Sequence, residues 1–521
     1  MSESNTMEQF SFTLDYSGET RRVSKHWQFC IGSGHAALAH RTDYMEQLKT
    51  VHDELGIERV RFHGIFNDDM NVCQKLSDHL PLASRNRTKL YSFYQVAKIY
   101  DKLLEIGVKP FVELGFMPSA LASGKKTVFY YKGNVTMPKK MTEWQDFIRA
   151  FARFLIDRYG EEEVTSWYFE VWNEPDLACF FKGSMKDYYR LYAETARALK
   201  SVNPNIKVGG PATTKSRHLT EFLDFCKREN VPVDFLSTHQ YPTDELGHSL
   251  NGQRLREIRR MKTAAPDTSM RALLQPVFDN VNDFTPALKG YLTREAKKAR
   301  AEAGSLPLFY TEWSISSNCV AAIHDTTRTA SFLVKTVLDN QGIVDGSSYW
   351  TFSDIFEELF FFPDPFCGGF GLMTADGIKK PAFWAFRLLA ELPDTRYCLP
   401  ITDEKTEMAA FKSDNGELYL MLYAQNFEDT ENKYEISITV ENSPHFHKVQ
   451  AKRINSRHAN PVRLWEEMGK PAVLSREQLD CIKKSSLPLT EEITPHPSEN
   501  GCHIDLTIEE NEVVLIRLER E

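Results

Sequence analysis

"WYFEVWNEPD", residues 167–176, decides the fold: a run of aromatic and β-branched residues leads directly into Asn173 and Glu174. Such a run is typical of a buried β-strand. A carboxylate at the end of a buried strand is costly unless another group pairs with it or a reaction uses it. The stretch therefore predicts a buried strand that ends at a functional acid, Glu174.

The same pattern recurs over about the first 390 residues, where short apolar runs alternate with amphipathic helical segments. This alternation is typical of a parallel sheet. The predicted strands are 28–33, 58–64, 109–116, 167–172, 207–211, 234–240, 306–313 and 346–352. Because eight strand–helix units close a barrel, we predict an α/β fold with a (β/α)8 TIM barrel. A doubly wound sheet is the alternative.

Beyond residue 392 the pattern changes to alternating strands, which predict an antiparallel β-sandwich. A Pro-broken helical segment interrupts these strands near 458–486. We therefore predict a catalytic barrel over 16–392. An accessory β-sandwich, formed by 1–15 and 393–521, would carry the helical segment as an insertion.

Composition restricts the possible partners. With 521 residues the chain is too long for one ordinary core, which fits a large domain and a smaller one. A net charge of -9 argues against a nucleic-acid partner or an anionic membrane surface. The 9 cysteines show no metal-binding spacing, and no secretory signal or run of ~20 apolar residues is visible. We expect a cytoplasmic protein.

Polar residues close the predicted strands, and in a (β/α)8 barrel the chemistry lies at the carboxyl ends of the strands. These residues are His63, Asn173, Glu174, His239, Tyr241 and Glu312, followed after the eighth strand by Trp350, Asp354, Glu357 and Glu358. Glu174 and Glu312 would face one pocket from different strands. Glycoside hydrolysis needs such a pair of carboxyl groups. The alternative, a buried salt bridge from one of them to an arginine such as Arg61, explains one glutamate but not the joint placement of both.

The remaining candidates would hold a sugar. Each histidine alone, His63 or His239, is more often a core or capping residue, but their shared strand-end position favours a functional role. Neutral imidazoles there would bind hydroxyl groups. Phe116, Phe180 and Trp350 are sugar-stacking candidates or plain packing residues. The loop 354–377 sets Glu357 and Glu358 among phenylalanines. Loops of that length are usually functional, so these acids are predicted to accept bonds from sugar hydroxyls.

Several segments, in their order along the chain, resemble those of a known family. They are "PFVELGFMPSALASGKKTVFYYKGNVTMPK", "FEVWNEPDL", "KVGGPA", "VPVDFLSTHQY", "YTEWSIS", "SSYWTFSDIFEE", "GGFGLMTADGIKKPAFWAF" and "HANPVRLWEEMGKPAVLS". With them the chain resembles the retaining glycosidases of clan A, and more narrowly the β-xylosidases of glycoside hydrolase family 39. The likeness covers nearly the whole chain. "Asn-Glu-Pro" is only moderately specific, whereas "YWTFSDIFEE" is much more so.

The resemblance implies a retaining exo-glycosidase that releases β-linked xylose from the non-reducing ends of xylo-oligosaccharides. Glu174 would be the general acid/base and Glu312 the nucleophile. The implied sugar-site residues are His63, Phe116, Asn173, Phe180, His239, Tyr241, Trp350, Glu357 and Glu358. No metal or organic cofactor is expected. The chain departs from the family's usual pattern within "WNEPD" and "TEWSIS", and neither departure changes a catalytic carboxylate.

Other functions remain open. A relative in the same family would act on another glycone: a galactoside, glucoside, arabinopyranoside or iduronide. An iduronide site needs a basic residue, and the acidic pair Glu357 and Glu358 argues against one. A non-catalytic carbohydrate-binding protein would have no need of both Glu174 and Glu312. The expected partner is a small carbohydrate, and the oligomeric state, with a homodimer or homotetramer as options, is left open.

Overall fold

The structure is a computed structural model that describes residues 7–79, 88–242, 260, 288–358, 364–402, 404–427 and 431–520. Eight parallel strands form a closed barrel in the order β10-β11-β12-β13-β14-β3-β4-β7. Their bounds are β3 Cys30–His35, β4 Arg59–His63, β7 Lys109–Glu113, β10 Tyr168–Glu170, β11 Lys207–Thr213, β12 Phe235–Gln240, β13 Leu308–Trp313 and β14 Gly346–Tyr349. The predicted (β/α)8 barrel is confirmed.

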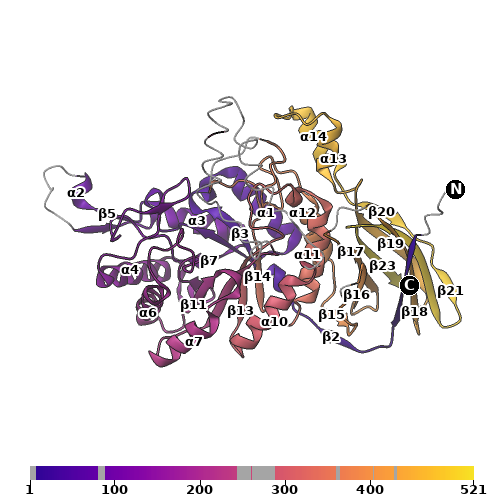
Figure 1. The fold of residues 1–521 in the computed structure, drawn as a ribbon, viewed down its shortest axis with the longest axis horizontal. Coiled ribbons are helices and arrows are strands. Elements are labelled where there is room, and N and C mark those ends of the chain that lie inside the picture. Colours follow the sequence, from indigo (N-terminus) through magenta and orange to yellow (C-terminus); the bar gives the residue numbers. More distant parts are fainter. Residues whose placement is uncertain are drawn as a thin grey trace.

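Helices surround this barrel (Figure 1). The described helices between the barrel strands and after the last of them are α1 Thr42–Leu55, α2 Leu76–His79, α3 Tyr94–Glu105, α4 Met141–Tyr159, α5 Glu161–Thr165, α6 Met185–Val202, α7 Leu219–Arg228, α10 Tyr291–Ala303, α11 Thr327–Asp339 and α12 Pro381–Ala390. Of these, α2 lies away from the barrel, beside the strand β5 Cys73–Lys75 (Figure 1). α4 shows why they dock: Trp144, Phe147 and Phe151 recur at three-to-four spacing and are all buried. No described helix has the length and apolar character needed to span a membrane.

The inside of the barrel has an aromatic half and a charged half. Phe111, Phe235 and Phe309 form a buried cluster with Cys30. Residues two apart on a strand share a face, so Glu113 lies directly above Phe111 on β7. Glu113 also pairs in register with Glu170 of β10. The apolar cluster therefore closes one end and leaves a charged layer facing the site at the other.

The accessory domain contains two sheets, of order β1-β18-β22-β21 and β2-β15-β16-β17-β23-β19-β20. The strands are β1 Glu8–Asp15, β2 Thr20–Arg22, β15 Thr395–Tyr397, β16 Thr406–Lys412, β17 Leu418–Ala424, β18 Lys433–Glu441, β19 Phe446–Ile454, β20 Leu489–Glu492, β21 His496–Ser498, β22 Gly501–Glu509 and β23 Val513–Arg520. They lie to one side of the barrel (Figure 1). The pairs are antiparallel except that β1 runs parallel to β18.

Two details refine the predicted organisation. β2 lies on the barrel side of the predicted boundary at residue 16 but pairs with β15 in the accessory sheet. The apolar signal of a three-residue exposed strand is too weak to place it from sequence. The helices α13 Pro461–Glu467 and α14 Arg476–Ser485 fall within the predicted insertion near 458–486. The remaining domain boundaries stay a prediction.

Two short hairpins extend the loops of the barrel. One pairs β5 Cys73–Lys75 with β6 Lys89–Tyr91, and the other pairs β8 Thr127–Val128 with β9 Gly133–Asn134. The second lies between β7 and α4, in a loop that leaves the carboxyl end of a barrel strand. It therefore reaches the end of the barrel where chemistry is expected.

Candidate active site

A pocket of about 230 Å³ opens at the carboxyl ends of the barrel strands. The predicted site residues that line it are His63, Asn173, Glu174, Phe180, Tyr241, Glu312, Trp350 and Glu358. They come from strands and loops spread over some 300 residues of sequence, so barrel closure is what brings them together.

Three predicted sugar-site residues lie outside the pocket lining. His239 is fully buried beneath the two catalytic candidates. Phe116 is also fully buried, and its ring packs behind that of His63 at a centroid distance of 6.1 Å. Glu357 turns toward Arg41, 4.0 Å away, with 31% of its side chain exposed. Of the two adjacent acids, it is Glu358 that faces the pocket.

Glu174, His239 and Glu312 meet at one point of the pocket. One carboxyl oxygen of each glutamate and an imidazole nitrogen of His239 all lie within 4.8 Å of one another. Nδ1 of His239 is 2.9 Å from Oε1 of Glu174 and 3.5 Å from Oε2 of Glu312. Two carboxylates and an imidazole are also ligands that Zn²⁺ accepts, so this is the group of described residues that could hold a metal ion.

The backbone at Glu174 is strained. Its φ is 43°, in the left-handed region that residues other than glycine rarely adopt. Such a conformation costs about 1–3 kcal/mol and persists where the surroundings impose it. Here the Glu174 N–H donates to the carbonyl of Ala212 at 2.9 Å, which ties the residue to the next barrel strand. The strain fixes the direction in which this carboxyl group points.

Arg61 organises the charged layer beneath the pocket. It is fully buried and donates to Oε1 of Glu312 at 2.8 Å and to Oδ1 of Asn173 at 2.9 Å. The salt bridge considered as an alternative to catalysis is therefore present, but it uses only one oxygen of Glu312. The other oxygen, Oε2, accepts from Tyr241 at 3.0 Å. Asn173 and Glu312 are thus held by the same guanidinium group.

Burial and neighbouring charges act in opposite directions on Glu312. Burial raises the pKa of its carboxyl group, and the cations of Arg61 and His63 act against that rise. Burial also places the pKa of His239 well below its ordinary value, so this imidazole is neutral near pH 7. Burial outweighs the two opposing charges, so the pKa of Glu312 lies above its ordinary value, beside a neutral histidine.

Glu358 is a largely buried acid, with 14% of its side chain exposed, and burial raises its pKa from 4.5 to about 8. In the unfolded chain it releases its proton near 4.5, so between about pH 4.5 and 8 the folded protein holds more protons. The free energy of unfolding must then fall as the pH rises through this window. We expect Glu358→Gln, which has no proton to lose, to gain in melting temperature relative to the wild type between pH 5 and pH 8.

Thermal melts of both proteins at these two pH values test this expectation. Glu357→Gln serves as the control, because its side chain is partly exposed and lies outside the pocket lining. A difference between Glu358→Gln and the wild type that is the same at both pH values would contradict the assignment.

The hairpin β8–β9 contributes residues that the sequence did not single out. The ring of Phe129 lies 6.1 Å from that of His63 and 5.3 Å from that of Phe180, measured between centroids. The N–H of Tyr130 donates to the Glu358 carbonyl at 2.8 Å. The only sequence signal was the aromatic "VFYY" in a long loop after the third strand. The pocket lining also includes Leu177, Thr214, Ser317 and Phe370.

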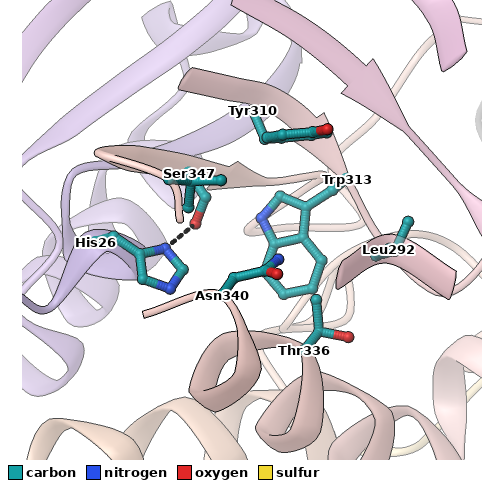
Figure 2. A pocket seen from close by; sticks show the side chains of 8 residues that line it. His26, Leu292, Tyr310, Trp313, Thr336, Asn340 and Ser347 are labelled. Atoms are coloured by element: carbon teal, nitrogen blue, oxygen red, sulfur yellow. Dashed lines mark hydrogen bonds between the residues drawn. The ribbon is translucent and has the colours of Figure 1, made fainter. Parts of the chain in front are cut away.

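A separate cavity lies on the outer side of β13. Figure 2 shows the Trp313 indole, which follows Glu312 in sequence, beside Asn340, with His26 hydrogen-bonded to Ser347. This cavity measures about 10 Å³, enough for about one water molecule and far too small for a sugar. β13 is irregular at this point, because its pairing register shifts between Tyr310 and Trp313. Thr311 and Glu312 both bond to groups inside the barrel, whereas Tyr310 and Trp313 both line the cavity behind the strand.

Comparisons with known proteins point to one family. The sequence profile of Glycosyl hydrolases family 39 matches residues 11–263 and 280–502. A β-xylosidase from Caldicellulosiruptor saccharolyticus is 40% identical over 97% of this chain and 98% of its own length. A β-xylosidase from Geobacillus stearothermophilus is 34% identical over 96% of this chain and 94% of its own length. The crystal structure of a monomeric β-xylosidase from Caulobacter crescentus CB15 superposes with a TM-score of 0.79 and 29% identity, covering 98% of this chain and 99% of that one.

Proposed function

The chain belongs to glycosyl hydrolases family 39, and from this premise we propose that it is a retaining β-xylosidase that releases xylose from the non-reducing ends of xylo-oligosaccharides. The single observation that carries the mechanism is the carboxyl pair: one oxygen of Glu174 lies within 4.8 Å of one oxygen of Glu312. Retaining glycosidases hold their carboxyl groups ~5–5.5 Å apart, whereas inverting enzymes keep ~6.5–9.5 Å for a water molecule. This spacing supports double displacement.

In the first step Glu312 attacks the anomeric carbon while Glu174 donates its proton to the departing glycosidic oxygen. The C–O bond of the substrate breaks as the glycosyl ester of Glu312 forms. In the second step Glu174 takes a proton from water, and the resulting hydroxide equivalent displaces Glu312 from the sugar. The configuration at the anomeric carbon is inverted twice and so retained.

The other pocket residues would hold the sugar. Asn173, fixed by Arg61, is suited to bind the 2-hydroxyl, where contacts strengthen in the transition state. His63, Tyr241 and Glu358 supply further polar groups, and Phe180 and Trp350 supply aromatic walls. We assign His239 and Phe116 to positioning from beneath and behind. Glu357, turned toward Arg41, is assigned to holding its loop in place.

The identity of the sugar is tested by comparing glycosides. Phe129 and Trp350 pack against the ring of His63, and Phe180 packs against Phe129. We expect this wall to exclude the CH₂OH group of a hexose. Steric exclusion exceeds the ~1–3 kcal/mol that a missing methylene costs, so a nitrophenyl xyloside should exceed the glucoside in kcat/KM by more than about 100-fold.

Variants of the two adjacent acids refine this test. Glu358→Gln should lower kcat/KM for the xyloside, while Glu357→Gln should stay near the wild type because its side chain points away from the pocket. A glucoside, galactoside, arabinopyranoside or iduronide that outperforms the xyloside would refute the β-xylosidase assignment and leave the retaining mechanism intact. A carbohydrate-binding protein would release no sugar from any of them.

We also propose a cytoplasmic location and xylan breakdown as the setting of this activity, in line with the unpaired state of all the cysteines. The β-xylosidase from Caulobacter crescentus CB15 is monomeric. A dimer or tetramer of this chain stays a prediction.

A further inference from the structure

Glu113 is a buried carboxylate that the proposed mechanism does not use. It is the last residue of β7, and its side chain is 0% exposed. Its Oε2 lies 2.9 Å from a terminal nitrogen of Arg61 and 2.6 Å from Nδ1 of His63. A buried charge is tolerated when it is paired, so this carboxylate depends on Arg61 and on the ring of His63.

The second nitrogen of His63 faces two other acids. Nε2 is 3.6 Å from Oε1 of Glu312 and 3.6 Å from Oε1 of Glu358. Toward Glu312, an unprotonated Nε2 would direct its lone pair at a carboxylate oxygen, whereas Nε2–H offers that oxygen a proton. Nδ1 also needs a proton to donate to Glu113. A histidine that donates from both nitrogens is an imidazolium cation.

The charges around His63 favour this form. The groups that face it are Glu113 on β7, Arg61 on its own strand β4, Glu312 on β13 and Glu358 after β14, with His239 of β12 nearby. Burial by itself would lower the pKa of His63, and Arg61 acts in the same direction. The carboxylates of Glu113 and Glu312 outweigh both and raise the pKa of His63 above its ordinary value.

We propose that Glu113 is a positioning residue that holds His63 as an imidazolium, with Nδ1–H donated to Glu113 and Nε2–H directed at the space between Glu312 and Glu358. The effect of this cation on catalysis rests on the proposed function, whereas the protonation state of His63 does not. The cation would keep the nucleophile ionised and present a donor to a sugar hydroxyl. The imidazolium loses its proton as the pH rises through the pKa of His63, and both effects are then lost.

The first test measures the titration of His63 itself by NMR of the protein with isotope-labelled histidine. The spectrum of His63→Gln assigns the signal. We expect the wild-type ring to stay protonated above the ordinary histidine pKa, and in Glu113→Gln we expect it to lose its proton at a lower pH. An opposite charge within about 4–6 Å shifts a pKa by about 1–3, so the change is measurable.

Glu170→Gln is the matched control. Glu170 pairs in register with Glu113 and also binds Arg61, at 2.6 Å, but its other oxygen accepts from Thr311 rather than from His63. Both variants remove one buried anion from Arg61, so both report any general loss of stability. Equal pKa values for His63 in Glu113→Gln and the wild type, or equal changes in the two variants, would overturn the proposal.

Kinetics give a second readout. With a dinitrophenyl xyloside the leaving group needs no proton, so the alkaline limb of kcat/KM no longer reports Glu174. We expect this limb to move to lower pH in Glu113→Gln and to stay in place in Glu170→Gln; an unmoved limb in Glu113→Gln would count against the proposal. The absence of xyloside hydrolysis in the wild type would refute the proposed function, while the NMR titration would still decide the protonation of His63.

Discussion

Glu312→Ala should abolish hydrolysis, with a loss in kcat on the order of 10⁵-fold or more, because the glycosyl ester can no longer form on this carboxylate. Glu312 lies at the carboxyl end of β13, with one oxygen held by Arg61 and the other held by Tyr241. Exogenous azide, entering the space left by the carboxylate, should restore turnover and give a glycosyl azide of inverted configuration. Product analysis by NMR measures both effects.

The covalent intermediate can be trapped as a check on the same assignment. A 2-fluoro-xyloside with a good leaving group should accumulate on Glu312, and mass spectrometry of a digest would locate the label. Arg61→Met, which removes the cation that favours ionisation of Glu312, should slow the labelling. A label on Glu357 or Glu358 would refute the assignment.

Glu174→Ala should produce losses that depend on the leaving group. For xylobiose, whose leaving alcohol needs a proton, we expect kcat/KM to fall by about 10²–10⁴-fold. For a dinitrophenyl xyloside the first step needs no acid, so kcat/KM should change little. The second step still lacks its base, and the glycosyl enzyme should accumulate with a burst of released dinitrophenol.

Stopped-flow measurement of that burst separates the two roles of Glu174. Azide should accelerate the second step and yield a glycosyl azide of retained configuration. In Glu312→Ala the glycosyl azide has the inverted configuration instead. Equal losses for xylobiose and for the activated substrate would remove Glu174 from the acid role.

The sequence alone predicted the fold because each barrel strand carries its own local signal. Apolar runs such as 306–313 and amphipathic helices such as 144–160 report burial within a few residues of themselves. The strand ends then identified Glu174 and Glu312, since a polar residue that closes a buried strand is visible without knowing its neighbours. Eight of the eleven predicted site residues line the pocket. Five of these eight were identified as polar residues at strand ends: His63, Asn173, Glu174, Tyr241 and Glu312.

Side-chain direction within loops had no comparable signal. Glu357 and Glu358 are adjacent in sequence and of the same type, and only the packed loop turns one into the pocket and the other toward Arg41. Phe129 was likewise hidden, because the hairpin β8–β9 reaches the site through contacts with Phe180 and the Glu358 loop.

Tertiary structure also decided how the charges are shared. The sequence offered Arg61 as an alternative to catalysis, yet the closed barrel lets one guanidinium group bind Glu312 and Asn173 while Glu113 and Glu170 balance its charge. Electrostatic pairing depends on distances of a few ångströms between residues up to 251 positions apart. Local sequence patterns fix which segments form strands, but only barrel closure sets those distances, and with them the protonation states on which the proposed chemistry depends.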